Sequence, residues 1–342
     1  MEYESYELLA KLANQYKLDI NKDEDVEKIL TLFKSRVEEL GKSPTFVYGK
    51  RLENAFFEMV KALDSVKFIK EEDTQKVYSE LDFKIPDYKI VSKDEEIFLV
   101  EVKNFTSVAS TKNINKHTEY TLTQKYWNQL KIYSELFSIP VKIVIFWRNW
   151  ELWTLNDLDE FKSVGVKRKI KLFEAFSYSK MYKLGDKLIG TKSPLVFRLI
   201  MEPKPLDIDK PSMKVVSKII DVQMCSEENV IRDKEISRFA YLLFWFGKWK
   251  QEGPFPVIKD NTFHGMEYIA KPIEETSRQG FEMIATLSMM YMNMYHLLTY
   301  REVGLPNIYP KGELPTIAKI IPENPFDRGL PLWIFTMVPS FQ

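Results

Sequence analysis

The run from Val141 to Trp147 constrains the fold more than any other segment of the chain. Its sequence, VKIVIFW, is apolar at every position except Lys142. Successive side chains of a strand point to opposite faces of a sheet, so a run that is apolar at both alternating positions fits a strand covered on both faces. The sequence therefore predicts a sheet with further layers packed against it, in an α/β fold.

Periodic patterns on either side of this run predict the other elements. Segments whose apolar residues recur at helical spacing alternate along the chain with segments whose apolar residues recur at every second position. Runs of two to five polar residues between predicted strands indicate tight turns. In chain order we expect a helix at 46–63, strands at 77–85, 88–91 and 97–103, a helix at 121–137, and strands at 141–147 and 150–155.

The chain of 342 residues divides by pattern into three parts. Residues 1–42 hold ten acidic and seven basic residues with leucines at helical spacing, which predicts an N-terminal helical segment that covers the core. Residues 43–180 carry the predicted sheet. Residues 181–342 contain prolines that suggest a linker and apolar runs near 233–249 and 273–298, so we expect a mainly helical C-terminal domain. Its role would be substrate or partner selection, or oligomerisation.

Composition excludes several kinds of site. The chain has one cysteine, Cys225, and three histidines, which rules out a four-cysteine zinc site and an iron–sulfur cluster. Any metal must therefore be held mainly by oxygen. Lys plus Arg and Asp plus Glu both number 49, so no net positive charge attracts nucleic acid. No apolar run fits a membrane span and the N-terminus does not fit a signal peptide, so we expect a cytoplasmic protein with no membrane partner.

The residues with the clearest chemistry lie between 85 and 103. Ile85-Pro86-Asp87-Tyr88 is followed by Glu101-Val102-Lys103 at the end of a predicted strand, with thirteen residues between Asp87 and Glu101. Period-two geometry places Glu101 and Lys103 on one face, and a hairpin would bring Asp87 towards Glu101. Two carboxylates that converge repel each other unless a cation neutralises them, and oxygen ligands suit Mg²⁺, with Mn²⁺ able to substitute.

This arrangement resembles the PD-(D/E)XK nuclease superfamily, and the resemblance covers roughly residues 46–155. It implies a restriction-endonuclease-like core, a mixed five-stranded sheet flanked by helices. It also implies a role for each matching residue. Asp87, Glu101 and the backbone carbonyl of Val102 would hold the metal, Lys103 would orient or activate the attacking water, and Glu53 on the preceding helix would be a supporting ligand.

The helix after the lysine carries a second similarity. Gln129-Leu130-Lys131-Ile132-Tyr133 matches the Q-x-x-x-Y motif of RecB-like members, which gives Gln129 and Tyr133 a supporting role. Both residues could equally be core residues with satisfied hydrogen bonds. Glu53 could be a solvated helix residue, and Asp82 and Glu80 are rival metal ligands that we rank below Asp87. Tyr126 and the neighbouring tryptophans fit packing better than base stacking.

Basic residues supply candidate phosphate contacts. Residues 161–180 hold six basic residues and one acidic residue, mixed with aromatics. The candidate nucleic-acid contacts, there and near the predicted site, are Lys50, Arg51, Lys125, Lys167, Arg168, Lys169 and Lys171.

These patterns lead to one functional hypothesis and two alternatives. The hypothesis is a Mg²⁺-dependent phosphodiesterase that cuts DNA rather than RNA, as an endonuclease in repair, restriction or antiviral defence. A homodimer or a partner protein could assemble through the C-terminal domain. The alternatives are a non-catalytic nucleic-acid-binding or assembly module that retains the nuclease fold, and a protein-interaction component in which the motif arose by chance.

Overall fold

The computed structural model describes residues 2–72, 77–106, 118–206, 214–273, 278–323 and 328–339. The chain forms two compact units. One comprises Met1–Asn54 with Thr299–Lys311, and the other comprises Ala55–Leu298 with Gly312–Gln342. The boundary falls within helix α3 (Pro44–Ala62), so this helix contributes its first half to one unit and its second half to the other.

The first unit is helical, as the leucine spacing predicted. It contains α1 (Glu2–Tyr16), α2 (Asp23–Gly41) and the first half of α3. Ala13 of α1 and Ile29 of α2 are buried. Arg51 is also buried, and its Nε and Nη2 donate hydrogen bonds to the Thr299 hydroxyl at 3.0 and 2.7 Å.

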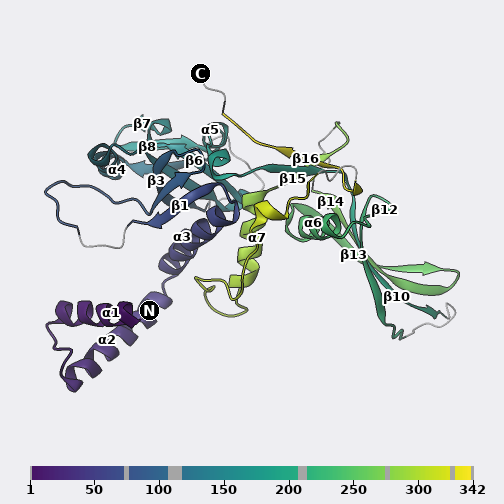
Figure 1. Ribbon diagram of the computed structural model, residues 1–342, viewed down its shortest axis with the longest axis horizontal. Helices are drawn as coiled ribbons and strands as arrows, with labels where there is room; N and C mark the ends of the chain where they lie inside the picture. The colour runs from purple at the N-terminus through teal and green to yellow at the C-terminus, as the bar shows by residue number, and fades with distance from the viewer. Residues whose placement is uncertain are drawn as a thin grey trace. The chain divides into compact units, whose positions relative to one another are not determined.

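The second unit is built around a mixed five-stranded sheet with the strand order β1-β2-β3-β5-β6 (Figure 1). Neighbouring strands are antiparallel except β3 and β5, which pair in parallel with Glu101 opposite Ile143 and Lys103 opposite Ile145. The mixed five-stranded sheet is thus confirmed. The strands are β1 (Val66–Glu71), β2 (Tyr88–Ser92), β3 (Ile97–Phe105), β5 (Val141–Trp147) and β6 (Leu152–Asp157).

Strand β5 has the predicted bounds, and all seven of its residues are buried. Lys142, the one residue of β5 that is not apolar, is 4% exposed. Its ammonium nitrogen lies 2.6 Å from Oδ1 of Asp157 in β6. The Asp157 carboxylate also accepts a hydrogen bond from Lys180. Two cations beside this half-buried carboxylate hold its pKa below the usual value, although burial works in the opposite direction.

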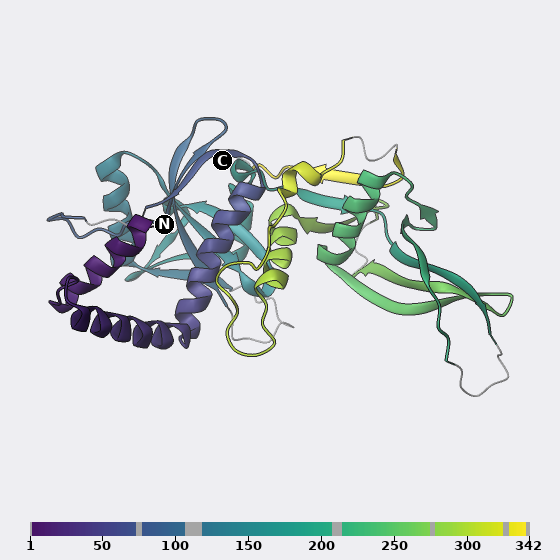
Figure 2. The same ribbon diagram turned by 60° about the horizontal axis from the view of Figure 1, so that its bottom comes forward.

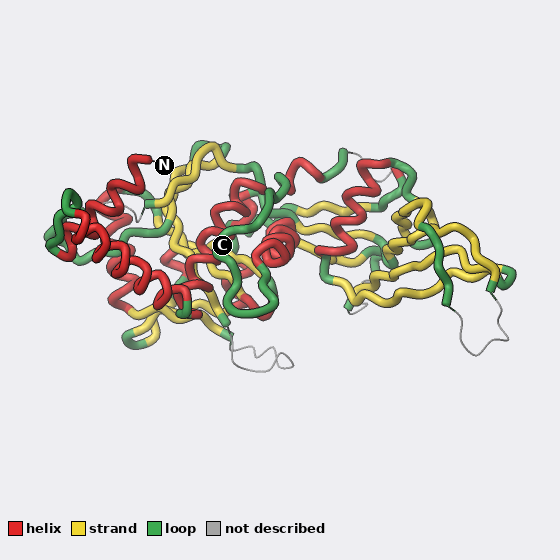
Figure 3. The backbone as a smooth tube through the Cα atoms, turned by 90° about the horizontal axis from the view of Figure 1, so that it is seen from below, coloured by secondary structure: helices red, strands yellow, loops and turns green. Residues whose placement is uncertain are grey.

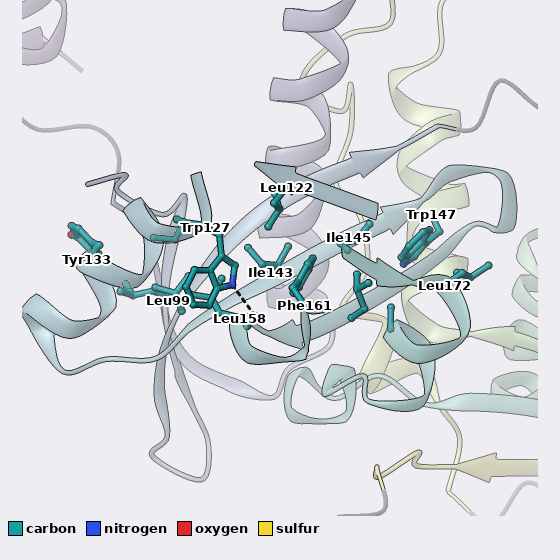
Figure 4. Close-up of a cluster of buried hydrophobic side chains, with 14 residues drawn as sticks. Leu99, Leu122, Trp127, Tyr133, Ile143, Ile145, Trp147, Leu158, Phe161 and Leu172 are labelled. Atoms are coloured by element: carbon teal, nitrogen blue, oxygen red, sulfur yellow. Dashed lines mark hydrogen bonds between the residues drawn. The ribbon is translucent and has the colours of Figure 1, made fainter. Parts of the chain in front are cut away.

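Helix α4 (Gln124–Phe137) packs on one face of the sheet. Thr123 caps its first turn by accepting a hydrogen bond from the backbone N–H of Tyr126, and Ser138 ends it in a left-handed conformation with φ of 53°. Figure 4 shows Trp127 close to the sheet, where its indole N–H donates to the carbonyl of Leu158 at 2.9 Å. Buried residues of this core include Leu99, Trp127, Leu130, Tyr133, Ile143, Ile145, Trp147 and Phe161.

The second half of α3 packs on the opposite face. The ring of Phe56 lies 5.9 Å from that of Tyr88 and 5.7 Å from that of Trp153, and Phe57 also contacts Tyr88. The sheet is therefore covered on both faces, as the composition of β5 predicted.

The predicted strand at 77–85 does not form. Within the described residues from 77 to 87 the chain has no helix or strand, and the outer strand of the meander is instead β1. The alternation has another cause: Phe83 and Ile85 pack against the α4 core, while Val77 and Leu81 are exposed. An extended segment that lies on a helix can therefore show a period of two without pairing to a sheet.

A second, small sheet contains part of the basic segment 161–180. It has the order β4-β8-β7, with β4 (Glu119–Thr123), β7 (Lys162–Val164) and β8 (Lys167–Lys171). Helix α5 (Leu172–Ser177) comes directly after β8.

The prediction of a mainly helical C-terminal domain is wrong. Strands form most of its regular structure, as Figure 3 shows in yellow, beside two helices, α6 (Lys234–Phe246) and α7 (Leu287–Thr299). The apolar runs near 233–249 and 273–298 do contain these two helices, although the second run also contains β15, and the predicted linker residues 195–205 form β10. The strands are β9 (Leu188–Thr191), β10 (Leu195–Pro205), β11 (Ile219–Ser226), β12 (Asn229–Val230), β13 (Trp249–Lys259), β14 (Thr262–Pro272), β15 (Glu282–Thr286) and β16 (Leu332–Phe335).

These strands form two further sheets, with the orders β12-β11-β10-β14-β13 and β15-β9-β16. Figure 2 shows β13 and β14 as a long twisted hairpin. Pro254 and Pro256 lie in β13, an edge strand, where the missing N–H groups need not break a ladder. Pro203 and Pro205, two of the prolines that suggested a linker, lie in β10, so proline content misled the sequence-based prediction. Among the described residues, none of the helices is long and apolar enough to cross a membrane.

Candidate active site on strand β3

Strand β3 carries the acidic and basic side chains that the sequence singled out. Glu101 and Lys103 point to the same face as Leu99, towards α4. Glu101 is 2% exposed, and Lys103 is about a fifth exposed at its side chain. The ammonium Nζ of Lys103 lies 2.6 Å from Oε1 of Glu101, which makes a nearly buried ion pair.

Tyr126, in the first turn of α4, completes this contact. Its hydroxyl donates to Oε1 of Glu101 and accepts a hydrogen bond from Nζ of Lys103 at 2.7 Å. The same ammonium lies 4.5 Å from the centre of the Tyr126 ring. The Thr123 cap fixes the first turn of α4, and thereby places the phenol over the two β3 side chains.

Asp87 joins the group from the position just before the neighbouring strand, β2. The β2–β3 ladder begins at the pair Tyr88 and Val100, so the N–H of Val102 lies beyond it. That N–H donates to Oδ2 of Asp87 at 2.7 Å. The carboxylate of Asp87 therefore lies against the backbone between Glu101 and Lys103.

The electrostatics around Glu101 fix the protonation of two phenols. Burial, followed by the charge of Glu101, raises the pKa of Tyr126 far above its ordinary value, and Asp87 adds to the effect. Burial and Glu101 raise the pKa of Tyr120 to about 12. Both phenols are therefore neutral at physiological pH, and Tyr126 can act as a hydrogen-bond donor to Glu101.

One oxygen of Glu101 has no partner among the described residues. Its Oε2 is buried and accepts no hydrogen bond, while Oε1 accepts two. A buried carboxylate oxygen without a donor is costly, because desolvation is not compensated. A divalent cation that takes oxygen ligands would satisfy this atom.

The protein donors at β3 would fill only part of the coordination shell of such a cation. Within the described residues, no three His, Cys, Asp or Glu side chains gather into a metal-binding group. The ligands available at β3 are the carboxylates of Asp87 and Glu101 and the backbone carbonyl of Val102. This set suits Mg²⁺, which keeps several waters and often uses one or two carboxylates.

The other predicted supporting residues lie as follows. Glu53 belongs to the first unit and pairs with Lys50 at 2.7 Å. Gln129 is half-buried and donates to Oδ1 of Asp82 at 2.6 Å, and Tyr133 is buried against Phe83. Within the described residues, the Gln129 side chain makes no hydrogen bond to Glu101, Lys103 or Asp87.

The rival acids differ from Asp87 in exposure. The side chain of Asp82 is 69% exposed and contacts Gln129 and Lys125, and Glu80 is also exposed. A hydrogen bond from Gln129 is the main cause that lowers the pKa of Asp82. These residues point outward, as their alternation suggested.

The candidate phosphate contacts divide by accessibility. Arg51 was predicted to contact a phosphate. Its guanidinium is instead buried against Thr299 and is not placed for that contact. Arg168 lies over the Trp127 ring at 4.1 Å and bonds to Gln124, so it also has a structural role.

The remaining cations are more accessible. Lys169 pairs with Glu119, and Lys125 lies 3.4 Å from Asp82. Lys50, Lys125, Lys167 and Lys171 are exposed.

Sequence reasoning missed Tyr126 as a site residue. It placed Tyr126 on the apolar stripe of α4 and interpreted it as packing. The available signal was position: a tyrosine in the first turn of the helix, directly after a threonine cap, lies at the end of α4 that faces the E-x-K strand. From that position, a contact between the Tyr126 hydroxyl and Glu101 could have been predicted.

Comparison with known proteins identifies no family. No model of a known protein family matches this chain, and no curated protein sequence matches it either. Among solved structures, the chain is similar to Hjc, a Holliday junction resolvase from the hyperthermophilic archaeon Archaeoglobus fulgidus. The similarity has a TM-score of 0.30 and 15% sequence identity, and it covers 40% of this chain and 96% of that one.

Proposed function

We propose that this protein is a metal-dependent nuclease that hydrolyses phosphodiester bonds, with DNA as the preferred substrate. The observation that carries the proposal is the buried carboxylate of Glu101, which has Lys103 on one oxygen, no partner among the described residues on the other, and Asp87 one backbone group away. The covered mixed sheet and the order of its elements agree with a restriction-endonuclease-like core.

Each residue has a distinct task in this proposal. Asp87, Glu101 and the carbonyl of Val102 would hold a divalent cation. That cation would supply the charge that stabilises the pentavalent transition state of the phosphate. Tyr126 donates a hydrogen bond to Oε1 of Glu101, which fixes the orientation of the carboxylate and leaves its other oxygen outside this hydrogen bond.

Lys103 would act on the water or the phosphate. Its ammonium carries three donors, of which two go to Glu101 and Tyr126. The third donor is able to contact an attacking water or a phosphate oxygen. A lysine suits this role because a compact ammonium contacts a single oxygen without requiring a bidentate partner.

One observation favours a second candidate, a non-catalytic module that keeps the nuclease fold. Lys103 already neutralises Glu101, and the described residues supply no third acidic ligand near the pair. A structural ion pair would look the same. The two candidates differ in whether a divalent cation binds.

The test combines metal binding with cleavage. Linear duplex DNA, circular duplex DNA, single-stranded DNA and RNA are incubated with Mg²⁺, Mn²⁺ or EDTA. Calorimetric titration measures binding of each metal to the wild type and to Asp87→Asn and Glu101→Gln. We expect metal-dependent cutting that falls at least about a hundredfold in Asp87→Asn, Glu101→Gln and Lys103→Met, the scale of losing a preorganised electrostatic group.

A matched pair on the same sheet gives the control. Lys67 and Glu95 form an ion pair at 2.7 Å, with side chains that are 48% and 80% exposed. Glu95→Gln and Lys67→Met make the same chemical changes and should leave cleavage and metal binding unchanged. A wild type that binds neither metal and cuts no substrate, while it still retains nucleic acid, would establish the non-catalytic module instead.

A further inference from the structure

A cavity of about 660 Å³ lies between β11 and the start of α6, away from the residues of the β3 site. Three cationic side chains line it, Arg232, Lys234 and Arg238, together with Tyr241 and the acid Asp221. All three cations are exposed to solvent. This cavity is thus open, and its charged lining is mainly positive.

The positive charge of the cavity is not neutralised by its neighbours. Within the described part of the chain, Arg232, Lys234 and Arg238 form no ion pair. Asp233 and Glu235 could have balanced them, but both carboxylates contact Arg328, at 2.8 and 2.6 Å. Arg328 is the charged contact that lowers the pKa of Asp233, after a backbone hydrogen bond at the helix cap.

The remaining acid of the cavity is also engaged. Asp221 accepts hydrogen bonds from the backbone N–H of Val222 and from the side chain of Gln223, at 2.8 and 2.9 Å. The lining therefore has three cations and one hydrogen-bonded carboxylate. An anionic ligand would complement this charge.

The cations continue into aromatic side chains along one face of α6. Lys234, Arg238, Tyr241 and Trp245 are spaced by four, three and four residues, so they lie within about 60° of one another around the helix axis. Tyr241 and Trp245 are 41% and 40% exposed, and their rings lie 6.2 Å apart at 64°. Phe197 of β10 supports both rings, with centroid distances of 5.7 and 6.2 Å.

We infer that this face of α6, with the adjoining cavity, binds a single strand of nucleic acid. The inference deepens the proposed function and rests on it only for the class of ligand. Cations follow the phosphates, and exposed aromatic rings stack on bases without reading their sequence. From Lys234 to Trp245 the helix rises about 16 Å, so the cationic and aromatic ends of this face are separated along the helix axis by that distance.

An acidic peptide is the other ligand that three cations could attract. The aromatic end of the face decides between the two. Bases supply flat rings for Tyr241 and Trp245, whereas acidic side chains have no stacking surface to offer them. A duplex also fits less well, because its bases are already stacked and cannot lie on the two rings.

The test measures binding in EDTA, so that cleavage cannot occur. A fluorescent oligothymidylate of fifteen residues, used as the probe, is titrated with the full-length protein at several salt concentrations. We expect Lys234→Gln/Arg238→Gln to weaken binding about tenfold or more, and to reduce the slope of log affinity against log salt by about 1.4, since each single-strand phosphate contact contributes about 0.7. Trp245→Leu should weaken binding about tenfold, and Trp245→Tyr should restore it.

A double variant with the same charge change serves as the control. Lys250 and Lys271 lie on β13 and β14, and both pair with Glu252, at 3.0 and 3.1 Å. Lys250→Gln/Lys271→Gln should bind as the wild type does. Wild-type affinity and salt slope in Lys234→Gln/Arg238→Gln, unchanged binding in Trp245→Leu, or equal competition by polyglutamate would each overturn the inference. A wild type that binds the strand in EDTA but cuts nothing with Mg²⁺ would refute the proposed function and leave this binding site standing.

Discussion

Removal of the Lys103 ammonium would leave the buried carboxylate of Glu101 with one hydrogen bond and no counter-charge. Glu101 is 2% exposed, and its Oε2 has no partner in the described structure. Breaking a fully buried ion pair on one side costs about 3–5 kcal/mol. Because the Lys103 side chain is 21% exposed, water can replace part of its charge. We expect Lys103→Met to destabilise the sheet by about 2–4 kcal/mol in EDTA.

A divalent cation should reverse this loss if Asp87 and Glu101 hold metal. The assay is hydrogen exchange of the β3 and β5 peptides, residues 97–105 and 141–147, because it reports the opening free energy of the sheet independently of the first unit. Mn²⁺ in excess should restore most of the protection in Lys103→Met and change the wild type less.

The double variant Glu101→Gln/Lys103→Met tests the cause. It should be more stable than Lys103→Met in EDTA, and it should not respond to Mn²⁺. The exposed pair supplies the reference, since Lys67→Met should cost less than about 1 kcal/mol. The reasoning is refuted if Lys103→Met costs no more than Lys67→Met, or if its loss in EDTA is large and Mn²⁺ leaves it unchanged.

Three further predictions concern separate parts of the second unit. Tyr126→Phe should weaken metal binding about tenfold and leave the fold intact, because Glu101 loses the donor that orients it; calorimetry against Tyr120→Phe checks this. Leu130→Ala should cost about 2–5 kcal/mol, since this side chain is fully buried in the α4 core; denaturant unfolding with Leu136→Ala, an exposed position, gives the comparison. Burial raises the pKa of Asp186 from 3.8 to about 6, against the hydrogen bonds from Ser288. The native state therefore binds the proton more tightly, and stability from this group should fall by up to about 3 kcal/mol between pH 4 and pH 6 and stay constant above. The stability of Asp186→Asn, measured by unfolding across that pH range, should not show this decrease. A pH profile identical to that of the wild type would contradict the prediction.

The sequence predicted the centre of the sheet well and its edge poorly. Val141–Trp147 is apolar on both faces except at Lys142, which fits a doubly covered strand, and the predicted bounds match those of β5. The alternation in β3 correctly placed Glu101 and Lys103 on one face. The outer strand was misplaced because Phe83 and Ile85 alternate for another reason, their contact with α4, which lies far from them in sequence.

The C-terminal part shows a different limit. Several of its strands pair over long sequence distances: β10 pairs with β14, and β9 pairs with β15 and β16. Because prolines lie at strand ends and in an edge strand, the local sequence pattern did not predict these strands. The contact of Tyr126 with Glu101 is likewise tertiary: the pattern gave the helix face, but only the packing of α4 on β3 brings the hydroxyl to the acid.

The parallel pairing of β3 with β5 has a consequence for how the chain folds. A hairpin cannot join two parallel neighbours, so the ladder from Leu99 with Val141 to Phe105 with Trp147 closes only after the chain between them has crossed over. That crossing chain contains α4. Loop closure over some forty residues is slow compared with the formation of the flanking hairpins. We therefore expect the cluster of Glu101, Lys103 and Tyr126 to assemble in the same late step, so that partly folded chains carry no complete site.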